Sequence, residues 1–178
     1  MSRSEIQKSG GRMEGAGMAL AGLILGYAGI AIIPFVMIVA AIAIPSLLRA
    51  RIAANEASAV GTVRAITEAE ARYKEKFPEA GYACDLSNLG GDGEAPVSPQ
   101  HARIMDDAAS SGMQHGYLFA IQNCAAVGGA ATSYQVIAIP EKFNQSGVRA
   151  FCSDEGRIIK FDSTGSPEGC LRHGTVLD

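Results

Sequence analysis

Residues 15–48 read GAGMALAGLILGYAGIAIIPFVMIVAAIAIPSLL, a run of 34 residues without Asp, Glu, Lys, Arg, His, Asn or Gln. The hydrocarbon core of a bilayer takes about 20 helical residues, whereas the apolar region of a cleaved signal peptide has about 7–15. The run of 34 residues is longer than both of these lengths. We therefore predict that residues 15–48 form a transmembrane helix that the protein retains.

The helix is predicted to continue beyond the membrane, because the apolar residues after Leu48 recur at helical spacing. Charged residues fill most of the opposite face, although Glu56 and Glu70 interrupt the apolar stripe. Pro78 then ends the helix. Residues 49–77 are thus predicted to be an amphipathic continuation, with an apolar stripe formed by Ile52, Ala59, Val63, Ile66, Tyr73 and Phe77.

The remaining residues, 78–178, have the pattern of a small sheet domain. Gly-rich joints at 89–93 and 127–129 separate short stretches of strand character at 117–122, 133–139, 148–152 and 157–161. The last two stretches are predicted to form a hairpin, and Ser98-Pro99 to start a short helix that runs through Ala109. The predicted fold class is α+β: a long N-terminal membrane-embedded α-helix packed on a small antiparallel β-sheet.

The cysteines favour structural disulfides over a metal or redox site, because none of them forms a C-x-x-C pair. Four cysteines allow three connectivities. We favour sequential pairing, which encloses the shorter loops: Cys84 with Cys124, and Cys152 with Cys170. Disulfides need an oxidising compartment, so residues 78–178 are predicted to lie on the outer side of the membrane.

Charge agrees with this orientation and argues against a nucleic-acid partner. The 178 residues have 15 Lys+Arg and 18 Asp+Glu, a net charge of −3, without the basic patch that nucleic acids require. Residues 1–48 carry a net charge of +1, which leaves −4 for residues 49–178. We therefore predict that residues 1–14 are cytoplasmic and that the protein crosses the membrane once.

The sequence lacks the patterns of an enzyme or a cofactor-binding protein. His101, His115 and His173 have no spacing typical of a catalytic triad or metal pair, and no G-x-S-x-G or phosphate-binding loop is present. Asp154 and Glu155 in the predicted hairpin turn, with Asp162, would offer Ca²⁺ its preferred oxygen ligands if they gathered there. We favour a solvated turn, and predict no catalytic residue, cofactor or metal.

Residues 40–60 read AAIAIPSLLRARIAANEASAV. This stretch resembles the middle of the N-terminal helix of bacterial type IV pilins and type II secretion pseudopilins. Segments 81–89, 111–119 and 147–154 are similar to the globular parts of the same proteins, so the resemblance covers about residues 36–170. In that family the helix anchors the subunit in the inner membrane and then bundles with other copies in a filament, while the sheet domain forms the outer surface.

The start of the helix departs from that family. Members begin their mature chain after a cleaved Gly, commonly with Phe-Thr-Leu-Ile-Glu, and the glutamate helps to register the subunits. At this family's spacing from Pro45, the positions of the Gly, the Phe and the Glu are occupied by Leu23, Ile24 and Ala28. Residues 18–27 resemble instead a small membrane domain of unknown function found in many bacterial proteins. We therefore expect the cellular protein to keep its first residues.

The resemblance implies a structural, self-associating protein and leaves two functions open. In the first, the chain is a subunit of a pilus-like filament or secretion pseudopilus, with other pilin-like subunits and an assembly platform as its partners. In the second, it is a non-polymerising single-span protein that presents a pilin-like binding or accessory domain to the periplasm. The missing cleavage motif favours the second, and the retained helix with its stripe favours the first.

Contacts between subunits are predicted along residues 24–60. Ile52 and Ala59 lie close to the membrane, where we expect a domain attached beyond Phe77 not to cover them, and Glu56 is expected to meet a charge on a neighbouring copy. Gly residues permit close approach of helices in the membrane. The predicted contact residues are Gly26, Gly29, Pro45, Ile52, Glu56, Ala59 and Val60.

Overall fold

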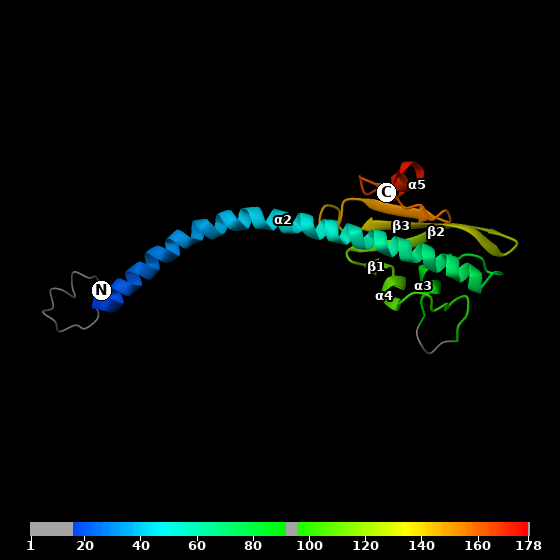
Figure 1. Cartoon of the computed structure of the whole chain (residues 1–178), viewed down its shortest axis with the longest axis horizontal. Helices are drawn as coiled ribbons and strands as arrows, with labels where there is room; N and C mark the ends of the chain where they lie inside the picture. Colours follow the sequence, from blue (N-terminus) through cyan, green and yellow to red (C-terminus); the bar gives the residue numbers. More distant parts are fainter. Residues whose placement is uncertain (1–15, 92–95, 178) are drawn as a thin grey trace. The chain divides into compact units, whose positions relative to one another are not determined.

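The computed structural model describes residues 16–91 and 96–177. They fall into two compact units that meet in the sequence between Leu47 and Leu48. Both units include part of one α-helix, α2 (Ala16–Lys76), which is coloured from blue to green in Figure 1. This helix ends next to Pro78, as predicted.

The apolar part of α2 is not covered by its own chain. None of the side chains described in residues 17–48 is buried, and both Pro34 and Pro45 lie inside the helix. A core helix of a soluble protein of this size would be mostly covered. The helix is long and apolar enough to cross a membrane, which is compatible with a single-pass protein.

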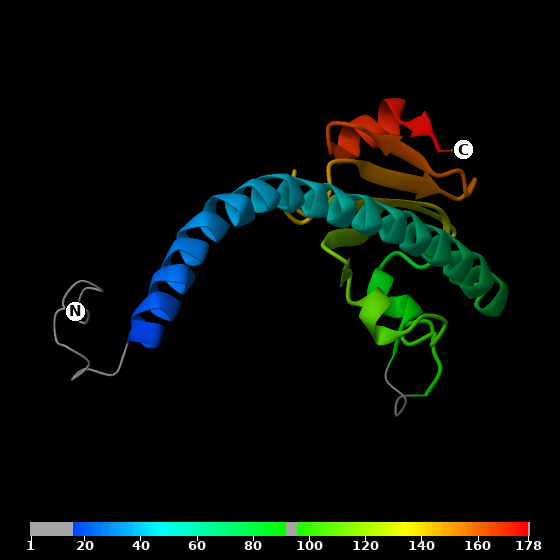
Figure 2. The ribbon, with the colours of Figure 1, turned by 60° about the vertical axis from the view of Figure 1, so that its left-hand side comes forward.

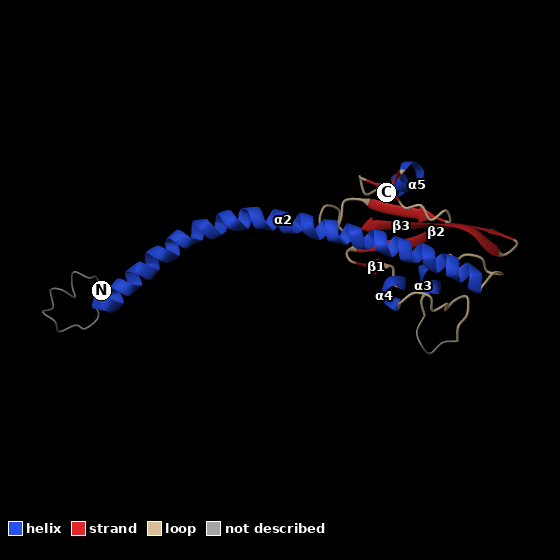
Figure 3. Ribbon diagram, in the orientation of Figure 1, coloured by secondary structure: helices blue, strands red, loops and turns tan. Residues whose placement is uncertain are grey.

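The rest of α2 packs against a small antiparallel sheet, which gives an α+β layout (Figure 3). From the helix, Ala59, Val63 and Ile66 are at most 1% exposed. Tyr117 and Phe151 meet them from the sheet, and each is fully buried. Four residues of the predicted apolar stripe, Ala59, Val63, Ile66 and Tyr73, therefore belong to the hydrophobic core, and Phe77 packs against it.

Within residues 96–177, six strands form one sheet in which each strand lies beside its sequence neighbour. All neighbouring pairs are antiparallel. The strands are β1 (Met113–Gln114), β2 (Tyr117–Val127), β3 (Ala130–Pro140), β4 (Ala150–Asp154), β5 (Lys160–Asp162) and β6 (Thr175–Val176).

The predicted strands are present, with different bounds. β2 and β3 are longer than predicted because Gly128 and Gly129 both adopt positive φ and close a two-residue hairpin, with Val127 opposite Ala130. β5 begins only at Lys160, three residues later than predicted. The other predicted joint, at 89–93, lies partly outside the described residues.

The predicted helix from Ser98 to Ala109 is wrong. Only α4 (Asp107–Ser110) is helical there, beside a four-residue helix α3 (Leu86–Leu89). The backbone N–H of Ala102 donates to the carbonyl of Asn88 (3.0 Å), and those of Ile104 and Met105 donate to the carbonyl of Leu89 (2.8 and 3.0 Å). Because these amides bond to a distant segment, they are not available for a local helix.

Both predicted disulfides are present. Cys84 and Cys124 join the segment before α3 to β2, with Cα atoms 5.8 Å apart. Cys152 and Cys170 join β4 to α5 (Pro167–His173), with Cα atoms 6.0 Å apart. In Figure 2, α5 (red) and the green segment that contains α3 lie at opposite edges of the sheet, so the two cross-links fasten separate parts of the domain.

Candidate functional site

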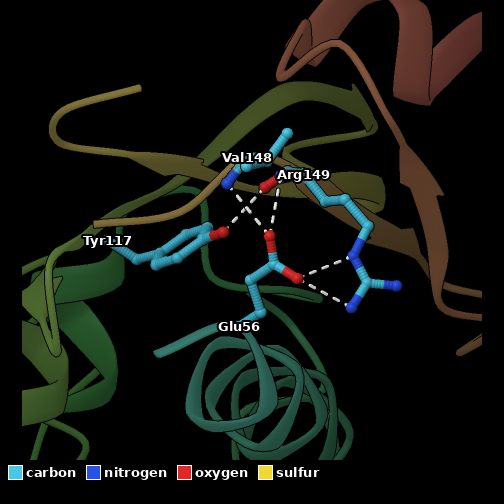
Figure 4. Close-up of polar contacts among 4 residues, drawn as sticks. All are labelled: Glu56, Tyr117, Val148 and Arg149. Atoms are coloured by element: carbon cyan, nitrogen blue, oxygen red, sulfur yellow. Dashed lines mark hydrogen bonds and ion pairs between the residues drawn. The ribbon is translucent and has the colours of Figure 1, made fainter. Parts of the chain in front are cut away.

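Glu56, on the buried face of α2, joins the helix to the sheet domain through several polar contacts (Figure 4). Its Oε1 accepts hydrogen bonds from the backbone N–H groups of Val148 (2.9 Å) and Arg149 (3.1 Å). Its Oε2 accepts from Nε of Arg149 at 2.8 Å and forms an ion pair with Nη2 of the same guanidinium, also at 2.8 Å. The helix is therefore fastened to the loop that precedes β4.

Tyr117 supports the same loop from the start of β2. Its hydroxyl donates to the carbonyl of Arg149 at 2.9 Å, as Figure 4 shows. The loop passes so close to the tyrosine that a Cβ at Gly147 would overlap the Tyr117 ring and hydroxyl. Burial, together with the Glu56 charge, raises the pKa of Tyr117, so its hydroxyl remains a donor.

Glu56 is ionised in this setting. Burial by itself raises the pKa of Glu56, but the amides of Val148 and Arg149 and the guanidinium together outweigh burial, and the pKa lies below its ordinary value. With four donors on two oxygens, the carboxylate is held in place and is not free to exchange protons with a substrate. We call Glu56, Tyr117, Val148 and Arg149 the loop clasp.

The prediction that Glu56 and Ala59 contact a neighbouring copy is wrong. Glu56 is 6% exposed and finds its cation within its own chain, and Ala59 is 1% exposed beneath the sheet. The domain reaches them because strands extend further per residue than helices. An 11-residue strand such as β2 spans about 36 Å, whereas the helix from Ala59 to Phe77 covers about 27 Å.

The other predicted contact residues differ in how exposed they are to solvent. Gly26 and Gly29 have open space where a Cβ would stand, and Pro45 is exposed. Ile52 and Val60 are half-buried, and Val60 packs against the core of the sheet domain. Their role between subunits stays a prediction.

The carboxylates considered for Ca²⁺ do not gather in the structure. Within residues 16–91 and 96–177, no three His, Cys, Asp or Glu side chains stand close enough to hold a metal ion. Asp154 Oδ1 accepts from the N–H of Gly156, and Asp162 Oδ1 accepts from the N–H groups of Thr164 and Ser166. Each aspartate thus stabilises its own turn.

Arg149 is the functional residue that sequence reasoning missed. It lies 93 positions from Glu56, and nothing local marks it as a partner. The available signal was on the helix, where Glu56 and Glu70 occur on an otherwise apolar stripe. A carboxylate at such a position must find donors in the domain that covers it.

The comparisons with known proteins identify no relative. No family model, no curated protein and no solved structure matches this chain. The helix, the sheet domain and the loop clasp are therefore the basis on which a function is assigned.

Proposed function

We propose that this chain is a structural, pilin-like subunit that is anchored in the inner membrane and self-associates through its N-terminal helix in a type IV pilus-like filament or secretion pseudopilus. One observation carries the proposal. The described residues of 17–48 have no buried side chain, whereas the rest of the same helix is covered by its own sheet domain. An apolar surface of this length needs lipid or other protein to cover it.

The apolar half of α2 contains a face suited to contact between helices. Gly22, Gly26 and Gly29 are spaced by four and three residues, so they share one side of the helix, and open space surrounds each of them. Small residues let two helix backbones approach closely in a membrane. We assign this Gly face to the contact between subunits.

The disulfides support the proposed orientation. Cys84–Cys124 and Cys152–Cys170 both lie in the sheet domain, and such cross-links persist in oxidising compartments. This favours a periplasmic or extracellular domain, which a filament subunit would present on its outer surface. The proposal assigns no catalytic residue and no cofactor, and its partners are other copies, the membrane and an assembly platform.

The role of the Gly face can be tested by replacing its glycines with larger residues. We expect the double variant Gly26→Leu, Gly29→Leu to reduce chemical cross-linking between copies in membranes several-fold, because leucine side chains hold the backbones apart. Ala31→Leu is the matched control, since residue 31 lies on the side of the helix opposite the Gly face. Unchanged cross-linking in the double variant, with the sheet domain still folded, would refute self-association through this face.

A second function is favoured by the loop clasp. Because Glu56 and Ala59 are satisfied within the chain, this part of the helix needs no neighbouring copy. In a non-polymerising single-span protein with a periplasmic accessory domain, contacts within the chain would be sufficient for this part of the helix. Mass spectrometry of the cellular protein, together with a search for it in sheared filaments, separates the two. A chain that retains its first residues and is absent from filaments supports the second function.

A further inference from the structure

A polar pocket of about 410 Å³ lies at the end of the sheet domain from which α2 leads toward the apolar run. Three segments form it: α2 with Arg51 and Asn55, the two-residue turn between β1 and β2 with His115, and the loop after β3 with Lys142. All belong to the unit that begins at Leu48. None of these residues takes part in the loop clasp.

The floor of the pocket is built by direct contacts. Nδ2 of Asn55 donates to the carbonyl of Ser146 at 2.8 Å, and Oγ of Ser146 accepts from the N–H of Lys142 at 3.0 Å. A Cβ at Gly116 would come within 2.8 Å of Cβ of Ser146, so the turn and the loop are closely packed. The pocket is therefore formed in the protein without a ligand.

Two of the charged residues that line the pocket, Arg51 and Lys142, form no ion pair with any of the residues that the structure describes. Among the described residues the ion pairs are Glu56–Arg149 and Lys160–Asp154, so Arg51 and Lys142 each lack a carboxylate. Two cations so close together are unexpected in residues 49–178, which carry a net charge of −4. Two cations that line a polar cavity, together with the imidazole of His115, suit an anion.

The position of Arg51 along α2 suggests which anion the pocket binds. Arg51 follows Leu48, the last residue of the apolar run, by three helical positions, or about 4.5 Å along the axis. Basic residues at this distance from a membrane span lie at the level of the lipid headgroups. This step rests on the membrane span in the proposed function, but not on self-association.

We propose that the pocket binds the phosphate of a membrane phospholipid headgroup through Arg51 and Lys142. The planar guanidinium of Arg51 presents paired donors to phosphate oxygens, and the ammonium of Lys142 adds a second positive charge. Glu141 also lines the pocket and repels a dianion more strongly than a monoanion. It therefore favours the phosphodiester of a lipid over free inorganic phosphate.

The experiment uses the full chain in an uncharged detergent, titrated with phosphatidylglycerol, with the bound lipid measured by native mass spectrometry. We expect Arg51→Gln with Lys142→Gln to weaken binding about tenfold or more. The matched control is Arg49→Gln with Arg64→Gln, which removes the same charge from α2 at exposed positions outside the pocket. Binding in the control should stay within about twofold of the unmodified chain.

Three outcomes would overturn the proposal. One is equal weakening by both double variants, which shows a diffuse charge effect. Another is unchanged binding by the pocket variant, and the third is displacement of the lipid by an equal concentration of inorganic phosphate. Lys142→Gln alone, an exposed loop substitution, replaces the double variant if the latter fails to fold.

Flotation with vesicles tests the membrane span separately. A chain that floats but binds lipid equally well without Arg51 and Lys142 refutes the pocket alone. A chain that does not float refutes the span, and with it both proposals.

Discussion

Two glutamates on the same helix have opposite electrostatic settings. Glu56 has four donors and a pKa below its ordinary value. Glu70 is fully buried, and its Oε2 accepts one hydrogen bond, from the N–H of Ala83 at 2.8 Å. Its Oε1 has no partner in the part of the chain that the structure describes. Burial raises the pKa of Glu70 to about 8, although the Ala83 amide opposes this.

The raised pKa of Glu70 gives folding a pH dependence of known sign. Between about pH 5 and 8 the unfolded chain has lost this proton and the folded chain retains it, so the free energy of unfolding falls as pH rises. The shift of the Glu70 pKa from 4.5 to about 8 corresponds to at most about 5 kcal/mol of unfolding free energy. Glu56 contributes no slope between pH 5 and 8. The stabilisation from its ionised form is lost only as pH falls below its ordinary pKa of 4.5.

We expect Glu70→Gln to flatten the decline in stability between pH 5 and 8, because glutamine has no proton to lose. The measurement is the unfolding midpoint of the sheet domain at several pH values in detergent. Glu68→Gln, at an exposed position on the same helix, serves as the control and should leave the slope unchanged. A slope that persists in the Glu70 variant would show that another group is responsible.

At the scale of elements, α2 meets two different environments along one continuous helix. Its apolar half is exposed on all sides, and its second half is covered on one face by the sheet. The helix runs without a break from Ala16 to Lys76, while its apolar pattern changes from continuous to helical spacing after Leu48.

This arrangement predicts the effect of a charge at Ala59. We expect Ala59→Asp to destabilise the sheet domain by about 3 kcal/mol or more, because the carboxylate would be buried beside Val63 without a donor. Ala57→Asp, two positions away and exposed, should change stability little. Thermal unfolding of both variants, measured by circular dichroism, checks this. Equal midpoints would contradict the burial of Ala59.

At the scale of the whole molecule, the sheet domain is cross-linked at two places. The disulfides close loops with sequence separations of 40 and 18 residues, and a loop of this order contributes about 3–4 kcal/mol by restricting the unfolded chain. Their exposure differs, because Cys84 is exposed whereas Cys152 and Cys170 are at most 1% exposed.

We expect mild reductant to open Cys84–Cys124 before Cys152–Cys170, because a thiolate must reach the sulfur that it attacks. Alkylation followed by mass spectrometry would show which cysteines are modified first. The unfolding midpoint of the sheet domain should fall as the first pair opens. Simultaneous modification of all four cysteines would indicate that reduction requires global unfolding instead.

The sequence by itself determined the features that depend on neighbouring residues. The apolar run and the helical spacing after it predicted α2, and the adjacent glycines after Val127 predicted a turn that the structure shows as a hairpin. The sequence also predicted both cysteine pairs from loop length. Periodicity and turn geometry operate over a few residues, so a single sequence reveals them.

Only the tertiary structure decided which distant groups meet. Residues 102–105 were predicted to be helical, but their amides donate to carbonyls of residues 88–90. Glu56 was predicted to face another copy, but the loop before β4 brings Arg149 to it. In both cases the partner is set by strand length and register, which depend on the packing of the whole domain. A buried polar group must find its partner wherever the fold places one.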